Sequence, residues 1–264
     1  MDLQLTGKRV LVTGSTGGIG EGIAKGFAQE GATVIINGRR EAEAQRVAAE
    51  ITSDGGRAIV ALGDLSTDEG VDRVLSVITQ ELGGLDVLVN NAAGGEHQND
   101  MEAPASVWLS SYNSNVLSMV RLIQQVLPKM KEQGWGRIIN ISSAAAIQPS
   151  PGMGVYSTTK AAVNNLTVTL AQSMESDKIT INAVSPGAII TPAMVEMAQQ
   201  QGMANTWEEA ETTFATMMPQ TFPFKRMGKV NEIANVVLFL ASPLANYIHG
   251  ANIRVDGGYI PTIC

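Results

Sequence analysis

Short apolar runs alternate with longer amphipathic stretches along most of the chain, at a spacing of roughly 25–30 residues. Most of these runs are rich in β-branched side chains, a pattern typical of strands buried on both faces of a parallel sheet. The predicted strands are 9–13, 32–37, 57–62, 86–90, 136–141, 179–184 and 253–255. The predicted helices are 21–29, 41–52, 68–82, roughly 105–131, roughly 156–174, and 230–240. The alternation predicts an α/β fold, a single doubly wound domain of the Rossmann type with a parallel sheet of about seven strands and helices on both faces.

Residues 188–224 interrupt this alternation. They contain no predicted strand but many large apolar side chains, among them Met194, Trp207 and Phe214. Because they follow a predicted strand at its carboxyl end, where doubly wound sheets bind ligands, we interpret them as a lid over a substrate site. The alternatives are a pair of helices that covers a sheet edge and a rigid contact between subunits. No linker divides the chain, so residues 1–264 are predicted to form one domain.

The composition argues against several other classes of protein. A formal net charge of −7 disfavours a nucleic-acid-binding surface. No apolar run approaches the roughly 18–20 residues of a membrane span, and the first residues do not resemble a signal peptide. One cysteine and two histidines leave little for disulfides or a metal centre, so we expect no metal. The sequence predicts a soluble, cytoplasmic protein with neither nucleic acid nor a membrane as partner.

A glycine-rich segment, 13–20, follows the first predicted strand and opens the first helix. Glycines there allow a tight turn and a close approach of the backbone to a pyrophosphate, and the helix N-terminus supplies N–H donors. A purely structural turn is the alternative, but the strand before and the helix after favour a dinucleotide site. The residues expected to bind the cofactor here are Gly14, Ser15, Thr16, Gly18, Ile19 and Gly20.

The end of the second predicted strand bears on the choice of cofactor. Sites selective for NAD usually carry Asp or Glu there, whereas an arginine accommodates the 2′-phosphate of NADP. This chain has Asn37 and Gly38 followed by Arg39 and Arg40, so two guanidiniums stand where a phosphate needs partners. The alternative is that both arginines are solvated residues at a helix start. We expect NADP as the preferred cofactor, with NAD as the second possibility.

Tyr156 and Lys160 lie four residues apart on a predicted helix, on one face and one turn from each other. A free tyrosine has a pKa of about 10, and a nearby cation lowers that value, so the pair would act as a general acid and base. Ser143 lies thirteen residues before Tyr156 at the end of a predicted strand, where its hydroxyl could bond a substrate carbonyl. The neighbouring Ser142 is a rival for this role.

Together these motifs resemble the short-chain dehydrogenase/reductase family over almost the full length of the chain. The resemblance implies that Ser143, Tyr156 and Lys160 are catalytic and that Asn115 helps to hold a water in a proton relay. It implies further cofactor-binding roles, beside those of Tyr156 and Lys160. The segments that carry them are Asp64-Leu65, Asn91-Ala92, the pair Pro186-Gly187, and Ile189 with Thr191. The chain departs from the family pattern at Ala93, which replaces a usual glycine.

The resemblance implies an NAD(P)-dependent oxidoreductase that transfers hydride between the nicotinamide and a small-molecule ketone or secondary alcohol, with Tyr156 as general acid/base. A 3-oxoacyl-[acyl-carrier-protein] reductase is the alternative, although Gly134 and Asp177 stand where such enzymes have basic residues for the carrier. A redox-silent dinucleotide-binding regulatory protein is a further alternative, against which the intact catalytic set argues. The resemblance also implies a homotetramer, formed through helices 105–131 and 156–174. His97 is interpreted as a surface residue.

Overall fold

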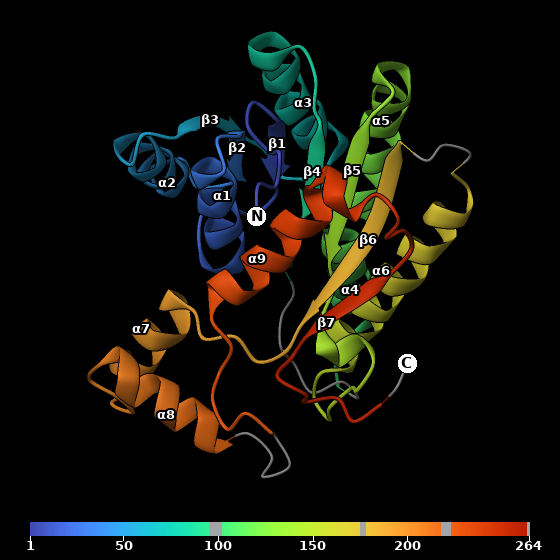
Figure 1. The fold of residues 1–264 in the computed structure, drawn as a ribbon. Coiled ribbons are helices and arrows are strands. Elements are labelled where there is room, and N and C mark those ends of the chain that lie inside the picture. Colours follow the sequence, from blue (N-terminus) through green and yellow to red (C-terminus); the bar gives the residue numbers. More distant parts are fainter. Residues whose placement is uncertain (95–101, 175–177, 218–222, 263–264) are drawn as a thin grey trace.

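Seven parallel strands form one sheet in the order β3-β2-β1-β4-β5-β6-β7 (Figure 1). The computed structural model describes residues 1–94, 102–174, 178–217 and 223–262, and the statements below concern these residues. The strands are β1 Arg9–Val12, β2 Thr33–Gly38, β3 Arg57–Leu62, β4 Val87–Asn90, β5 Gly136–Ile141, β6 Ile179–Pro186 and β7 Asn252–Val255. All predicted strands are present. The order reverses between β1 and β4, and ligands of doubly wound sheets bind at such a point, beyond the carboxyl ends of the strands.

Helices cover both faces of the sheet. They are α1 Gly18–Gln29, α2 Glu41–Ser53, α3 Asp68–Leu82, α4 Ala105–Tyr112, α5 Ser118–Gln133, α6 Gly154–Gln172, α7 Pro192–Gln200, α8 Trp207–Met217 and α9 Val230–Ala241. Alternate side chains of each central strand enter different cores. On β1, Val10 and Val12 join the core beneath α1, α2 and α9, whereas Leu11 joins the core beneath α3, α5 and α6. None of the helices in the described ranges combines the length and the apolar character that a membrane span requires.

The segment predicted as one long helix at 105–131 differs from that prediction. A π-helical turn, Asn113–Leu117, separates α4 from α5. Such a turn contains one residue more than an α-helical turn, so the residues on either side are rotated relative to a continuous helix. Asn115, in the middle of the turn, is completely buried. The π-helical turn thus carries a polar side chain that lies in the interior of the protein.

The segment proposed as a lid contains α7 and α8, which extend away from the sheet at the lower left of Figure 1. The two helices pack against each other around a small core of their own, built from Ile190, Val195, Ala198, Ala204, Ala210, Phe214 and Met227. The two ends of the hairpin lie side by side, paired by an isolated parallel bridge between Ile189 and Gly228. It is therefore a separate small unit on a narrow attachment.

Candidate active site

The turn between β1 and α1 is held by the end of β4. The side-chain amide of Asn91 donates to the carbonyl oxygens of Thr13 at 2.9 Å and Gly14 at 3.2 Å. Gly14 has a φ of +61°, and a Cβ on it would lie 2.9 Å from the Cα of Ala92. No described side chain caps the first turn of α1, so its N–H groups are available to an anion. The turn therefore has the form that a pyrophosphate site requires.

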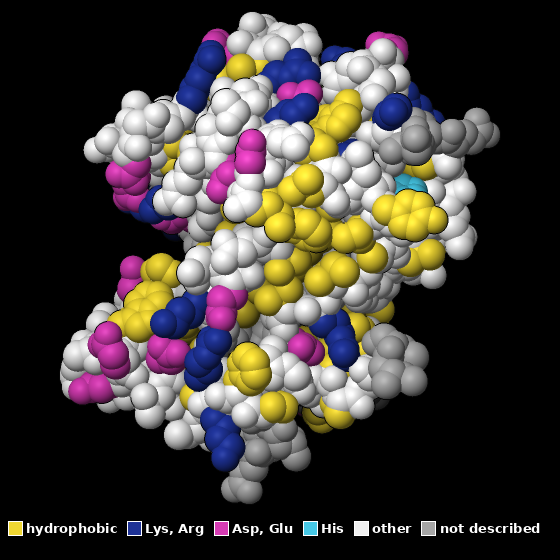
Figure 2. Space-filling model, viewed as in Figure 1, with side chains coloured by type: hydrophobic (Ala, Val, Ile, Leu, Met, Phe, Trp, Pro, Cys, Tyr) yellow, Lys and Arg dark blue, Asp and Glu magenta, His cyan; other side chains and the backbone are white. Residues whose placement is uncertain are grey.

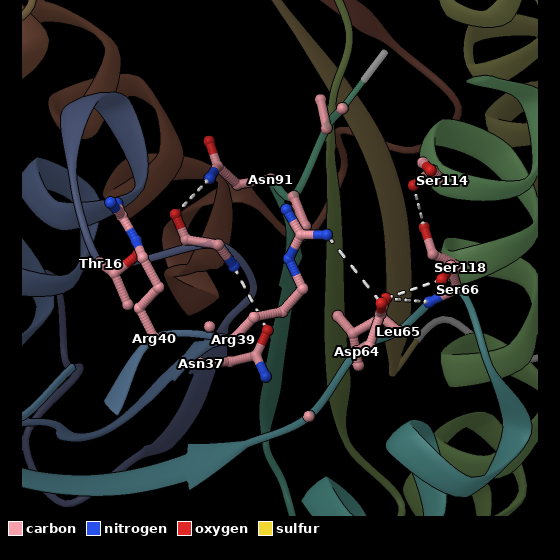
Figure 3. A pocket seen from close by; sticks show the side chains of 16 residues that line it. Thr16, Asn37, Arg39, Arg40, Asp64, Leu65, Ser66, Asn91, Ser114 and Ser118 are labelled. Carbon is pink, nitrogen blue, oxygen red and sulfur yellow. Dashed lines mark hydrogen bonds and ion pairs between the residues drawn. The ribbon is translucent and has the colours of Figure 1, made fainter. Parts of the chain in front are cut away.

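A cavity of about 410 Å³ opens beside this turn, between the ends of β2, β3 and β4 (Figure 3). Eight of the predicted cofactor residues line it: Gly14, Thr16, Arg39, Arg40, Asp64, Leu65, Asn91 and Ala92. Sequence reasoning missed Ser66, Ser114 and Ser118, which also line it. Ser114 lies one residue before Asn115 and Ser118 three residues after it. Their nearness to Asn115 on a predicted helix could have indicated that they line the same site. Ser15 instead uses its hydroxyl to accept the N–H of Asn37 at 3.0 Å and is buried.

Two opposite charges face each other across this cavity. The Arg39 Nη1 atom lies 4.0 Å from Oδ2 of Asp64, and the Arg39 side chain is 77% exposed. The other carboxylate oxygen of Asp64 accepts from the N–H and the hydroxyl of Ser66, and these bonds lower the pKa of Asp64. Asp64 is therefore a fixed anion, whereas the Arg39 guanidinium is solvated and available to a ligand phosphate.

The other predicted cofactor residues lie near the start of α1 and the end of β6. Pro186 ends β6, and a Cβ on Gly187 would lie 2.8 Å from the Cα of Asp256. The Thr191 hydroxyl accepts the N–H of Met194 at the start of α7. A Cβ added to Gly18 would lie 3.7 Å from the Thr191 methyl carbon, so this threonine lies beside the glycine-rich turn. The attachment of the α7–α8 hairpin is thus next to the glycine-rich turn.

The structure separates the two rival serines. Ser142 is buried, and its hydroxyl donates to the carbonyl oxygen of Lys160 at 3.1 Å. Ser143 accepts the N–H of Ala145 at 3.1 Å and forms a side-chain hydrogen bond with Tyr156. Ser143 is therefore the serine whose hydroxyl adjoins the phenol.

The expected effect of Lys160 on Tyr156 is corrected by the structure. Burial raises the pKa of the Tyr156 phenol, and the hydrogen bond from Ser143 only partly offsets this. The ammonium Nζ of Lys160 lies 5.7 Å from the centre of the Tyr156 ring and donates to the carbonyl oxygen of Ile141 at 2.8 Å. Burial lowers the pKa of Lys160 itself to about 8. Desolvation thus dominates both groups.

The side-chain amide of Asn115 is bonded to two other elements. Its Oδ1 accepts the N–H of Gly94 at 2.8 Å, and its Nδ2 donates to the Thr159 hydroxyl at 3.0 Å. Asn115 therefore connects the segment after β4 with the helix that carries Tyr156 and Lys160. Sequence reasoning missed Thr159, although it lies between those two residues.

Comparison with known proteins identifies the family. The family model described as "Enoyl-(Acyl carrier protein) reductase" matches residues 14–260. The uncharacterized oxidoreductase YvaG of Bacillus subtilis is 38% identical over 267 residues, which cover 100% of both chains. The chain belongs to the short-chain dehydrogenase/reductase family. The resemblance inferred from the sequence is thus confirmed, and this family member is an oxidoreductase.

Solved structures support the same assignment. One similar structure is that of L-sorbose reductase from Gluconobacter frateurii, complexed with NADPH and L-sorbose. It superimposes on this chain with a TM-score of 0.92, is 35% identical in sequence, and the match covers 100% of both chains. A 7α-hydroxysteroid dehydrogenase complexed with NADH and 7-oxo glycochenodeoxycholic acid has a TM-score of 0.87 and 33% identity, covering 100% of this chain and 98% of the other. The predicted Rossmann-type fold is confirmed.

His97 and Asp177 lie outside the described residues.

Proposed function

We propose that the enzyme transfers hydride between a nicotinamide dinucleotide, with NADP preferred, and a small-molecule ketone or secondary alcohol. The observation that carries this proposal is the Ser143–Tyr156 hydrogen bond, one helical turn from the buried ammonium of Lys160. This group adjoins the carboxyl end of the sheet, where the glycine-rich turn also lies. A proton donor and a cation beside a dinucleotide site suit carbonyl reduction.

The residues present fit such a cofactor. Two features suit a pyrophosphate. The turn at Gly14 has no room for a side chain, and the start of α1 has no side-chain cap. The residues at that helix start are Gly18, Ile19 and Gly20. Arg39, assisted by Arg40, would bind a 2′-phosphate, while Asp64 and Leu65 would contact the adenine. Pro186, Gly187, Ile189 and Thr191 would hold the nicotinamide. NADPH in L-sorbose reductase and NADH in the 7α-hydroxysteroid dehydrogenase support a nicotinamide cofactor here.

When bound, the cofactor would supply or accept the hydride. The side chains of the protein would transfer the proton and stabilise the charge on the substrate oxygen. In reduction, Tyr156 donates its phenolic proton to the substrate oxygen, and Ser143 stabilises the negative charge that develops there. The buried ammonium of Lys160 would bind the cofactor ribose. Asn115 belongs to the proton relay by resemblance. Its bonds to Gly94 and Thr159 give it, in addition, a role in aligning the helices.

A 3-oxoacyl-[acyl-carrier-protein] reductase is the second candidate, because a reductase of that name from Aquifex aeolicus is 36% identical to this chain over 259 residues. An acidic carrier requires basic residues at the entrance. The chain has Gly134 at one such position and a formal net charge of −7. Charge repulsion would slow its association with an acidic carrier, so we favour the small-molecule substrate.

The α7–α8 hairpin is proposed to be the substrate lid. It follows the residues assigned to the nicotinamide, and its own core lets it move as one body. Met197 and Trp207 of the hairpin are partly exposed, with 41% and 38% of their surfaces accessible. Methionine and aromatic side chains at such a surface would form an adaptable apolar wall for the substrate.

The same proposal includes a homotetramer in the cytoplasm. Leu109, Tyr112, Leu117 and Val168 are exposed hydrophobic residues on α4, the π-helical turn and α6, where the sequence places a subunit contact. A second hydrophobic patch covers α9 and β7 on the face shown in Figure 2. A tetramer of D2 symmetry needs at least two different interfaces, and two exposed hydrophobic surfaces are present. Light scattering of the purified protein would measure its mass.

The experiment that tests this function compares carbonyl substrates under one set of conditions. Oxidation of NADPH is followed with a panel of small ketones, including ketoses and steroid ketones, and with a 3-oxoacyl thioester on an acyl-carrier protein. We expect turnover of at least one small ketone at a higher kcat/KM than the carrier substrate. A carrier substrate that reacts faster than every ketone would favour the second candidate, and no turnover of any carbonyl would contradict the proposed function.

A further inference from the structure

The hydroxyl of Thr159 bridges α6 and the π-helical turn. It donates to the carbonyl oxygen of Tyr156 at 2.7 Å and accepts from Nδ2 of Asn115 at 3.0 Å. Thr159 is only 2% exposed and lies directly before Lys160. Its hydroxyl is thus bonded, out of contact with solvent, to the backbone of one proposed catalytic residue and to the side chain of another.

The direction of these bonds follows from their chemistry. A hydroxyl has one proton, and the Tyr156 carbonyl oxygen can only accept it. The hydroxyl must then use a lone pair toward Asn115, which presents its NH₂ group there. The opposite end of the amide, Oδ1, accepts the N–H of Gly94 at 2.8 Å. The Thr159 hydroxyl and the Gly94 N–H together therefore fix which way round the Asn115 amide lies.

We infer that Thr159 is a positioning residue for the reaction. The bonded series Gly94, Asn115, Thr159 and Tyr156 joins the segment after β4, the π-helical turn and α6. Loss of the hydroxyl would remove one of the two bonds that hold the Asn115 amide and would loosen the helical turn that carries Tyr156 and Lys160. This inference rests on the proposed function, which gives those three residues their roles.

A merely structural threonine is available for comparison on the same helix. Thr167 is 1% exposed, donates to the carbonyl oxygen of Val163 at 2.8 Å and accepts from Nδ2 of Asn140 at 2.9 Å. It makes the same two kinds of bond as Thr159, but it lies about three helical turns from Tyr156. Thr167→Val therefore removes a buried hydroxyl with the same kinds of hydrogen bond, at a distance from the proposed catalytic residues.

The test measures kcat, KM, the pH profile of kcat and Tm for Thr159→Val, Thr159→Ser and Thr167→Val. Valine keeps the shape of threonine and removes the hydroxyl. We expect Thr159→Val to lower kcat by about ten- to a hundredfold, since small misplacements of reacting groups cost rates of this order, and to shift the pH profile. Thr159→Ser should restore most of kcat. Thr167→Val should lower Tm by a similar amount while kcat stays within about twofold and the pH profile is unchanged.

Equal kcat losses in Thr159→Val and Thr167→Val would overturn the inference, and so would a Thr159→Val enzyme with unchanged kcat and pH profile. If Thr159→Val does not fold, Thr159→Ala against Thr159→Ser isolates the hydroxyl, and equal rates for these two would also contradict it. Tyr156→Phe is measured in parallel. An active Tyr156→Phe variant would count against the proposed function itself, whereas an inactive one beside an unaffected Thr159→Val would count against the positioning role alone.

Discussion

Lys160 donates from its buried Nζ to the carbonyl oxygen of Ile141 across 2.8 Å, which fastens α6 to the end of β5. The described residues place no carboxylate in an ion pair with this ammonium. Its charge is therefore held at a cost in desolvation, and the pKa of Lys160 falls to about 8 from 10.5. Burial thus destabilises the charged form of Lys160, and further hydrogen-bond acceptors from a ligand would stabilise it.

This depressed pKa gives a pH dependence of stability. Between pH 8 and 10.5 the unfolded chain binds the Lys160 proton and the folded chain does not, so the free energy of unfolding contributed by this group rises across that window. Below pH 8 both states are protonated and the contribution is constant. Urea unfolding of the wild type and Lys160→Met at pH 7, 9 and 10 should show the wild type gaining stability relative to the variant as pH rises. A difference that does not change with pH would contradict the lowered pKa.

Tyr156→Phe should abolish turnover and leave cofactor binding intact. The change removes the phenolic proton donor and the hydrogen bond with Ser143 but keeps the ring. Steady-state rates and the fluorescence of bound NADPH measure the two properties separately. Retention of more than a few per cent of kcat would show that another group supplies the proton.

Arg39→Ala should raise KM for NADPH by about ten- to a hundredfold, because a charge-assisted hydrogen bond contributes about 1.5–3 kcal/mol. KM for NADH should stay nearly unchanged. Arg73→Ala, which removes an exposed arginine outside the cavity, is the matched control for net charge. Equal use of both cofactors by the wild type, with no response to Arg39→Ala, would rule out the assignment of this guanidinium to the 2′-phosphate.

The α7–α8 hairpin should exchange its backbone hydrogens quickly in the free enzyme and become protected when NADPH and a ketone are bound. Its narrow attachment at Ile189 and Gly228 supports independent motion. Hydrogen exchange followed by mass spectrometry resolves this segment, with α5 as an internal reference. Slow exchange in both states would leave the rigid subunit contact as the better interpretation.

The strands were predictable because burial on both faces leaves short, nearly continuous apolar runs. The glycine-rich turn and the Tyr156–Lys160 pair were predictable because each depends on local spacing. The π-helical turn at Asn115 was not, since one extra residue in a helix leaves no periodic signal in the sequence. The direction of the Tyr156 pKa also depends on burial by segments remote in the sequence, so spacing alone gave the wrong sign.

The choice between Ser142 and Ser143 shows the same limit. Both hydroxyls follow β5 directly, and neighbouring residues of an extended chain point to opposite sides. Only the packing of α6 decides which of them meets Tyr156, since Ser142 is bonded to the carbonyl oxygen of Lys160 on that helix. Contacts between elements thus determine what the sequence pattern left open.

The separate core of the α7–α8 hairpin has a consequence for how this enzyme can diverge. The buried residues of α7 and α8 belong to neither of the two large cores that flank the sheet. We therefore expect substitutions at the buried positions of α7 and α8 to have little effect on the stability of the sheet. Selection for new substrates could act on this hairpin while the cofactor machinery stays constant, and an engineer could exchange it between relatives as a cassette.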